Sequence, residues 1–167
     1  MGSEMCIRDR LKSLREGGFN YPSTIEITSS ASEMIDEFDA LSKEDLEGLD
    51  KEFSIAGRMM AKRVMGKSSF SVIKDGTGSI QIFLSNTDLG DDCYQSFKTM
   101  DIGDIIWIKG SLFRTKTDEL TLNANKLVLL SKSLRPLPEK YHGLTDTEIR
   151  YRRRSVSYTH LTLPTKA

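Results

Sequence analysis

The stretch IAGRMMAKRVMGKSSFSVIKDGTGSIQIFL, residues 55–84, decides the fold of this chain. Its apolar residues alternate with polar or small ones, which is the period of a β-strand and not of a helix. The tetrapeptide DGTG at 75–78 lies between two such runs, and its glycines tolerate the positive φ of a tight hairpin turn. The stretch therefore predicts strands at 68–74 and 79–85, and Gly57 predicts a bend or bulge in a preceding strand that begins near Phe53.

The flanking sequence extends this pattern to a mainly β fold. A second hairpin is predicted across the turn 115–118, with strands at 105–113 and 119–130, and a helix at 91–100 precedes it. Five strands with a helix between strands 3 and 4 are the order of an OB-fold barrel. N-terminal helices are predicted at 11–16, across Met34 to Leu41 behind a capping box at Ser30, and at 43–49 behind Ser42.

Composition sets the outer bounds of the function. The 167 residues are 38% hydrophobic and 29% charged, which fits one globular domain with appendages. No apolar run is long enough to span a bilayer, and the N-terminus lacks a signal-peptide core. Cys6 and Cys93 lack CxxC spacing, so we expect no disulfide framework, no metal site and a reducing, cytoplasmic compartment. Cys93 is expected to be a small packing residue.

Zero net charge conceals a strong asymmetry along the chain. Residues 32–50 hold eight acidic residues and one lysine, whereas residues 51–85 hold six basic residues and two acidic ones. A protein that binds nucleic acid needs positive charge only on the face that meets phosphate. Such charge can equally well solvate exposed strands, so charge alone does not decide between the two interpretations.

The alternation of inward and outward side chains along each strand indicates which residues near the basic strand could read a base. A core needs Ile80 and Ile82 on the inner face, which places Gln81 on the outer face. Phe70 shares a face with Lys74, which favours the outer face for this ring as well. An exposed ring that stacks a base, an amide that reads its edge and nearby cations are the parts of a single-stranded nucleic-acid site. The cations are Arg58, Lys62, Arg63 and Lys67.

Two other functions remain open on this evidence. A free-standing OB module for single-stranded DNA or RNA would use Phe70, Phe83 and the same basic strand. A protein-interaction domain would instead bury Phe70 in its core, and it would show no salt-sensitive binding of RNA.

The sequence resembles the N-terminal anticodon-binding domain of class II lysyl-tRNA synthetases from about Leu11 to Arg154. Three phrases carry the resemblance: AGRMMAKRVMGKSSF at 56–70, GSLFRTKTDELTL at 110–122 and LRPLPEKYHGLTDTEIRYRRR at 134–154. Aspartyl- and asparaginyl-tRNA synthetases share the OB fold and the Phe/Gln pair but not these phrases.

The resemblance implies a site for the anticodon of tRNA(Lys). By that resemblance Phe70 stacks the central uridine, Gln81 hydrogen-bonds it, and Arg63 and Glu119 complete the pocket. Supporting RNA contacts are expected from Arg58, Lys62, Lys67 and Phe83. An amide suits this role because a uracil edge offers carbonyl acceptors and one N–H donor.

The resemblance also divides the chain and limits its chemistry. We expect a non-native tail at 1–10, a helical segment at 11–50, the OB domain at 51–131, a linker towards a catalytic domain at 132–154, and a second non-native tail at 155–167. Both tails look like translated adapter sequence, and no role is expected for His142 or His160. No catalytic residue and no cofactor is expected in this fragment. Its parent, a homodimer in this family, would use ATP and magnesium to attach lysine to tRNA.

Overall fold

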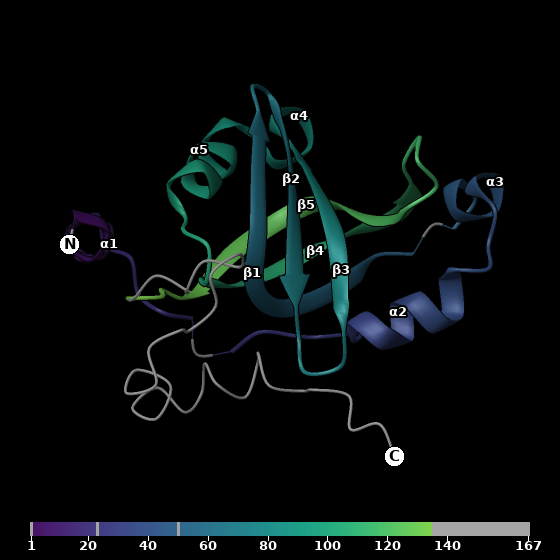
Figure 1. Ribbon diagram of the computed structural model, residues 1–167, viewed down its shortest axis with the longest axis horizontal. Helices are drawn as coiled ribbons and strands as arrows, with labels where there is room; N and C mark the ends of the chain where they lie inside the picture. The colour runs from purple at the N-terminus through teal and green to yellow at the C-terminus, as the bar shows by residue number, and fades with distance from the viewer. Residues whose placement is uncertain (1, 23, 50, 135–167) are drawn as a thin grey trace, which may run out of the picture. The chain divides into compact units, whose positions relative to one another are not determined.

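The chain folds as a closed five-stranded barrel with helices at its N-terminal side and one helical insertion (Figure 1). The computed structural model describes residues 2–22, 24–49 and 51–134. The barrel order is β1-β2-β3-β5-β4, in which β3 and β5 run parallel and the other neighbours antiparallel. The strands are β1 (Phe53–Met65), β2 (Ser68–Lys74), β3 (Ser79–Ser85), β4 (Ile105–Arg114) and β5 (Leu120–Ser131). The predicted OB-type barrel is confirmed.

Period-two alternation fixes the inner face of the barrel. Ile80, Ile82 and Leu84 of β3 are buried, with exposed fractions of 3%, 0% and 0%. In β2 the buried positions are Ser69, Ser71 and Ile73, as parity predicts. The two inward hydroxyls are satisfied, since the Ser71 Oγ donates to the Ala61 carbonyl at 2.7 Å and the Ser69 Oγ lies 2.7 Å from the Tyr94 hydroxyl. The predicted bounds of β2 and β3 are confirmed.

The connection between β3 and β4 contains two helices where one was predicted. The expected helix is α5 (Asp91–Thr99), which buries Tyr94 and Phe97 against the barrel. Before it lies α4 (Asn86–Leu89), whose first turn is capped by the Ser85 Oγ accepting from the Asp88 N–H at 3.1 Å. The Ser-x-x-Asp spacing at 85–88 is the signal that would have predicted α4.

Capping boxes begin the two helices that precede the barrel. In α2 (Ala31–Phe38) the Glu33 Oε2 accepts from the Ser30 N–H at 2.8 Å, which lowers the pKa of this carboxyl below its ordinary value. The helix α3 (Lys43–Glu47) begins after Ser42, as predicted, but ends before Leu49. Both helices place apolar side chains against the barrel, and Met34 and Phe38 are buried there.

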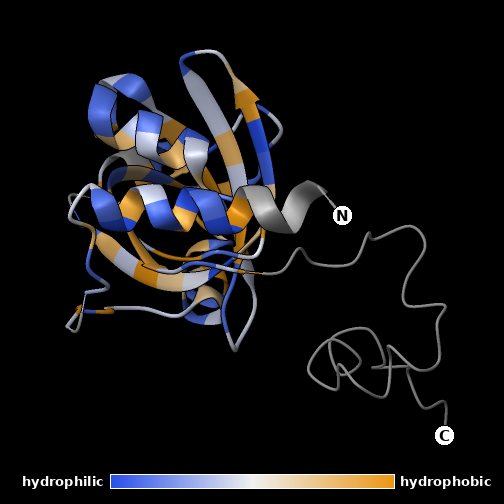
Figure 2. Cartoon of the chain, turned by 90° about the vertical axis from the view of Figure 1, so that its left-hand side faces the viewer, coloured by the Kyte–Doolittle hydropathy of each residue, from blue (hydrophilic) through white to orange (hydrophobic). Residues whose placement is uncertain are grey.

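The first helix is longer than the sequence predicted. α1 (Gly2–Glu16) begins nine residues before the predicted start at Leu11 and ends at the predicted glycine pair. Figure 2 shows α1 in front of the barrel, mostly hydrophilic with a few hydrophobic positions. Ile7 and Leu11 are buried, and Arg10 forms an ion pair with Asp101 at 3.0 Å. The expectation that residues 1–10 are non-native stays a prediction, although residues 2–10 form the first part of α1.

The turn between β2 and β3 is held by a carboxylate and not by positive φ angles. Neither Gly76 nor Gly78 has a positive φ, which corrects the role predicted for these glycines. Instead the Asp75 Oδ1 accepts from the N–H groups of Thr77 and Gly78 at 2.7 and 2.8 Å. The Asp75 Oδ2 accepts from the Ala31 N–H at 2.8 Å, so the same side chain also caps α2.

Gly57 permits a close approach of two strands and does not form a bulge. A Cβ at this position would lie 2.8 Å from the Lys74 carbonyl oxygen. The register shift of β1 lies later, between Met59 and Ala61. The predicted bulge therefore exists, but two residues further along the strand.

Several expectations concern parts of the chain without a description here. His142, His160, the tail at 155–167 and most of the linker at 132–154 lie outside the described residues.

Cys93 is exposed on α5, which corrects its predicted packing role. Within the described ranges no helix is long and apolar enough to cross a membrane.

We predict that Asp75→Asn lowers the free energy of unfolding at pH 7 by about 1–2 kcal/mol, because one carboxylate satisfies donors of both the turn and α2. Burial tends to raise the pKa of Asp75, but the hydrogen bonds from Ala31, Gly78 and Thr77 lower it overall. A carboxyl with a lowered folded pKa stabilises the protein above its unfolded pKa and loses that effect as pH falls through the folded value. The wild-type advantage should therefore shrink below about pH 4.

Urea denaturation at pH 7 and at acidic pH measures this difference. Asp36→Asn is the matched control, because Asp36 is an exposed carboxylate of α2. Equal effects of the two substitutions would show that Asp75 does not hold the turn.

Candidate nucleic-acid interface

Two rows of side chains cross the outer face of the barrel in strand register. One row runs Arg63, Phe70, Phe83 and Asn123 through β1, β2, β3 and β5, and the other runs Val72, Gln81, Thr121 and Phe113 through β2, β3, β5 and β4. In β2 and β3 the positions of these rows alternate with buried ones, so Phe70 and Gln81 face outward as parity predicts. The interpretation of Phe70 as a core residue is therefore wrong.

Three phenylalanines form a half-buried aromatic surface across these rows. The ring centroids of Phe70 and Phe83 lie 5.1 Å apart, and those of Phe83 and Phe113 lie 5.8 Å apart. Mutual packing fixes the rings while leaving part of each surface open, which suits the stacking of a planar ligand. Phe113 was not among the predicted site residues. Parity in β4 would have found it, because the neighbouring Leu112 is buried.

A groove of about 620 Å³ lies along the aromatic surface. It brings together residues of β1, β2, β3 and the β4–β5 hairpin, including all four residues predicted to bind the anticodon. Its lining is Ala61, Lys62, Arg63, Phe70, Ser71, Val72, Gln81, Phe83, Phe113, Thr115, Lys116, Thr117 and Glu119. The mixture of aromatic, amide and charged groups is typical of a site for single-stranded nucleic acid.

The Gln81 amide is held from two sides. Its Nε2 donates to the Glu119 Oε2 at 2.8 Å, and its Oε1 accepts from the Thr121 Oγ1 at 2.9 Å. Thr121 is fully buried, whereas Glu119 is exposed in the hairpin. An amide has two N–H donors and two acceptor lone pairs, so one donor and one acceptor stay available for a ligand.

Two cations at the groove have no bonding partner among the described residues. Arg63 lies beside Phe70 on the adjacent strand, and Lys116 projects from the β4–β5 turn; both are exposed. No hydrogen bond or ion pair joins either side chain to the described part of the chain. Both are therefore available for a phosphate or a base carbonyl. Lys116 was missed because a lysine in a turn is usually only solvated.

Lys62 has a structural role that differs from the predicted phosphate contact. Its Nζ donates to the carbonyls of Phe97, Lys98 and Met100 at 2.7–2.8 Å and lies 4.9 Å from the Phe97 ring centroid. All three ammonium donors are thus used at the end of α5, although the residue also borders the groove. Burial lowers the pKa of Lys62 from its ordinary 10.5 to about 8, against an opposing effect of the Asp101 carboxylate.

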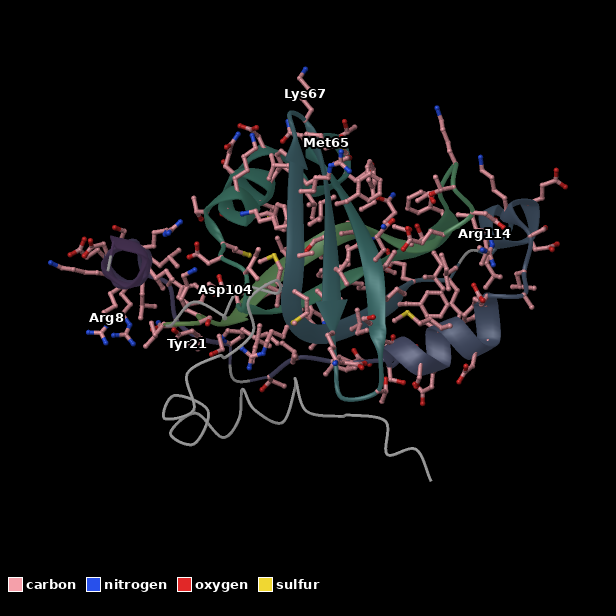
Figure 3. The ribbon with its side chains drawn as sticks, viewed as in Figure 1. Arg8, Tyr21, Met65, Lys67, Asp104 and Arg114 are labelled. Carbon is pink, nitrogen blue, oxygen red and sulfur yellow. The ribbon has the colours of Figure 1, made fainter. Side chains whose placement is uncertain are left out.

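Arg58 and Lys67 do not line the groove. The Arg58 Nη1 donates to the Gly103 carbonyl at 2.8 Å, so this guanidinium holds the loop before β4. Lys67 lies at the β1–β2 turn, where Figure 3 shows it pointing away from the barrel beside Met65. The supporting RNA contacts of Arg58 and Lys67 stay predictions, and both residues lie outside the lining of the groove.

Arg114 positions the hairpin that carries Lys116 and Glu119. It is 8% exposed, and it donates to the Leu41 carbonyl at 2.9 Å, to the Asp118 carbonyl at 2.7 Å and to the backbone of Asp39. Figure 3 shows Arg114 beside α3, at the base of this hairpin. The bridge ties the β4–β5 turn to the α2–α3 connection. The sequence contains no local signal for it, since the two partners lie more than seventy positions away.

The described residues contain no group of three or more His, Cys, Asp or Glu side chains that could hold a metal ion.

Residues 53–130 match the tRNA anti-codon family, described as an OB-fold nucleic acid binding domain. Over 149 residues the chain is 49% identical to the lysine–tRNA ligase of Paraburkholderia phytofirmans, 50% to that of Burkholderia multivorans and 51% to that of Thioalkalivibrio sulfidiphilus. Each alignment covers 89% of this chain and 29–30% of the relative. The chain thus spans less than a third of the length of the curated relatives it matches.

We predict that Lys62→Met lowers the free energy of unfolding by about 1–2 kcal/mol, because the last carbonyls of α5 lose a charged donor. Arg63→Met, on the neighbouring position of the same strand, should leave stability nearly unchanged, since Arg63 has no partner in the described chain. Denaturant unfolding of both variants measures this contrast. Equal stability of the two would show that the Lys62 contacts contribute nothing net.

Proposed function

We propose, from the match of residues 53–130 to the tRNA anti-codon family of OB-fold nucleic acid binding domains, that the groove binds the anticodon loop of tRNA(Lys). The observation that carries the proposal is the juxtaposition of the Phe70–Phe83 ring pair with the Gln81 amide on one outer face. A ring pair offers stacking to any base, and the amide adds selection at one base edge.

The proposed contacts follow from the chemistry of uracil. Phe70 stacks the central uridine, and Gln81 uses its remaining N–H and its remaining acceptor on the Watson–Crick edge. Arg63 and Lys116 stand at the groove with unused donors, which suits the phosphates on either side of a stacked base. Glu119 completes the pocket from the β4–β5 hairpin.

The choice of tRNA(Lys) rests on the relatives. The relatives that are 49–51% identical to this chain over 149 residues are named lysine–tRNA ligases. All residues that line the groove lie within the matched range 53–130. We propose further that this chain acts as the anticodon-binding part of such a ligase. The whole enzyme would attach lysine to tRNA in the cytoplasm, as a homodimer, with ATP and magnesium. None of the described residues is assigned to that reaction.

A second function would use the same surface without sequence selection. The aromatic surface continues from Phe70 through Phe83 to Phe113, which is long enough to favour general binding of single-stranded nucleic acid. Equal binding of the lysine anticodon stem–loop and of unrelated single strands would favour this module over the proposed function.

We predict that Phe70→Leu weakens binding of an RNA stem–loop with a UUU anticodon by about 1–3 kcal/mol, the usual worth of one base–aromatic stack. Leucine keeps apolar contact with Phe83, so the fold should persist. Tyr21→Leu is the matched control, since Tyr21 is a 42% exposed aromatic residue outside the groove. Titration of labelled stem–loop into folded variants measures the effect. If Phe70→Leu binds the stem–loop with unchanged affinity, the anticodon binds at another place on the protein.

We also predict that the basic residues differ in their contribution to the salt dependence of RNA binding. Arg63→Met and Lys116→Met should each reduce the slope of log K against log salt by about 0.7, because each removes a phosphate contact to a single strand. Lys62→Met should leave the slope unchanged, since its ammonium is committed to α5. Titrations of the stem–loop at several salt concentrations test this, and a flattened slope for Lys62→Met would refute the division.

A further inference from the structure

We propose that the turn between β1 and β2, residues 64–68, binds the ribose–phosphate backbone of a base-paired RNA stem. This segment, the β1–β2 tip, does not line the groove, which is proposed to take the unpaired loop. The inference rests on the proposed function, because the stem in question is the one that adjoins the loop in the groove.

The β1–β2 tip presents apolar and cationic side chains to solvent. Val64 and Met65 are 45% and 43% exposed, although both are large apolar residues. Lys67 is exposed as well, and no hydrogen bond or ion pair engages its ammonium within the described part of the chain. Figure 3 shows Lys67 pointing away from the barrel beside Met65. Adjacent apolar side chains on a projecting turn, next to an available cation, indicate a contact surface.

The backbone of the β1–β2 tip is held by the helices of the β3–β4 connection. The Gly66 carbonyl accepts from the Tyr94 hydroxyl at 3.0 Å, and the Lys67 carbonyl accepts from the Asn86 N–H at 2.9 Å. Tyr94 is only 1% exposed, so its hydroxyl is fixed by the core. Gly66 has a φ of 69°, which a two-residue hairpin turn requires at its first position. A turn that is already ordered avoids the entropic cost of ordering a loop on binding.

The charges at the two ends of the barrel favour the β1–β2 tip as the side on which the stem lies. Residues 63–68 contain Arg63 and Lys67 and no acidic residue. At the opposite end of β2 and β3, α2 begins beside the β2–β3 turn and exposes Glu33, Asp36 and Glu37 (Figure 1). A stem that left the groove at that end would meet these carboxylates, whereas over the β1–β2 tip it meets cations.

Acidic residues of α4 and α5 do not neutralise the β1–β2 tip. The Asp88 carboxylate accepts from the Ser85 hydroxyl at 2.9 Å as part of the α4 cap. Asp91 and Asp92 lie in the first turn of α5, where the helix dipole favours negative charge. None of the three forms an ion pair with Lys67 among the described residues. The Lys67 charge therefore stays available for a phosphate.

The β1–β2 tip continues the proposed RNA surface and differs from it in chemistry. Arg63 pairs with Phe70 at the groove, and Met65 lies about 7 Å further along β1 on the same outward side. Residues 64–68 include no ring and no side-chain amide, so they cannot stack or read a base. An A-form stem presents ribose and phosphate across a wide, shallow minor groove. Val64 and Met65 suit the ribose faces, and Lys67 suits a phosphate.

The double variant Met65→Ser/Lys67→Met tests the inference in the full chain. The probes are an RNA stem–loop with a UUU anticodon and a single-stranded RNA that has the same loop sequence without the stem. We expect the variant to lose roughly fivefold in affinity for the stem–loop and nothing for the single strand. Lys67→Met alone should reduce the slope of log K against log salt by about 1 for the stem–loop only. An unchanged melting temperature is expected, because both side chains are exposed.

Two matched controls separate the β1–β2 tip from other exposed side chains. Lys74→Met removes an exposed lysine at the opposite end of β2, and Ile102→Ser removes an apolar side chain that is 45% exposed in the loop before β4. Both controls should bind the two probes as the wild type does. If Lys74→Met weakens binding of the stem–loop and the tip variant does not, the stem lies at the other end and the inference is wrong. Equal losses of the tip variant on both probes would overturn it too, because the tip would then contact the unpaired loop.

The proposed function and the stem contact fail on different measurements. If the wild type binds the UUU stem–loop no better than an unrelated hairpin with the same stem, the anticodon proposal is wrong. The stem contact still stands in that case if the tip variant loses affinity for both hairpins. If the wild type selects the UUU loop and the tip variant binds it equally well, anticodon binding stands and the β1–β2 tip does not bind the stem.

Discussion

The groove depends on the alternation of side chains along the strands of a closed barrel. Ile80, Ile82 and Leu84 fill the interior, and a register slip of one residue would move them all to solvent. Burial of these three side chains therefore forces Gln81 and Phe83 outward, and the strand pairing brings Phe70 and Thr121 beside them. Because the barrel is closed, no strand edge is left to shift this arrangement. The hydrophobic core thus positions the polar site.

Two polar bridges attach the turns of the barrel to its N-terminal helices. Asp75 joins the β2–β3 turn to the start of α2, and Arg114 joins the β4–β5 hairpin to the α2–α3 connection. The segment that contains α2 and α3 is acidic, but none of its described residues lines the groove. Part of its backbone and one carboxylate, that of Asp39, serve to hold the hairpin that carries Glu119. The helices support the groove and do not line it.

Six basic residues in the described part of the chain form two groups that differ in their contacts. Lys62, Arg58, Arg114 and Lys132 are engaged by backbone carbonyls or by carboxylates, and Lys132 meets Asp104 at 2.7 Å with both side chains buried. Arg63 and Lys116 stand at the groove without partners in the described chain. A buried cation that is already paired gains little from a phosphate, because it would first have to break its bonds. The charge of a strand therefore overstates the number of cations that can meet a ligand.

The sequence alone determined the features that depend on local chemistry. Alternation predicted the bounds of β2 and β3 and the outward position of Phe70 and Gln81, and Ser-x-x-Glu spacing predicted the start of α2. These succeed because side-chain parity and helix capping act over a few residues. The resemblance to a family added Arg63 and Glu119, which line the groove with them.

Only the tertiary structure decided which partners the long charged side chains contact. It also decided the bounds of helices that the sequence pattern did not predict. The partners of Lys62 lie 35 to 38 positions away, and the partners of Arg114 in the α2–α3 connection lie more than seventy positions away, so no local sequence pattern predicts these contacts. The helix α1 is longer than its sequence pattern predicted, and its side chains Ile7 and Leu11 are buried. The β2–β3 turn is held by the Asp75 carboxylate and not by its glycines. A flexible charged side chain bonds to whichever backbone the fold brings within reach, and only the complete fold specifies that backbone.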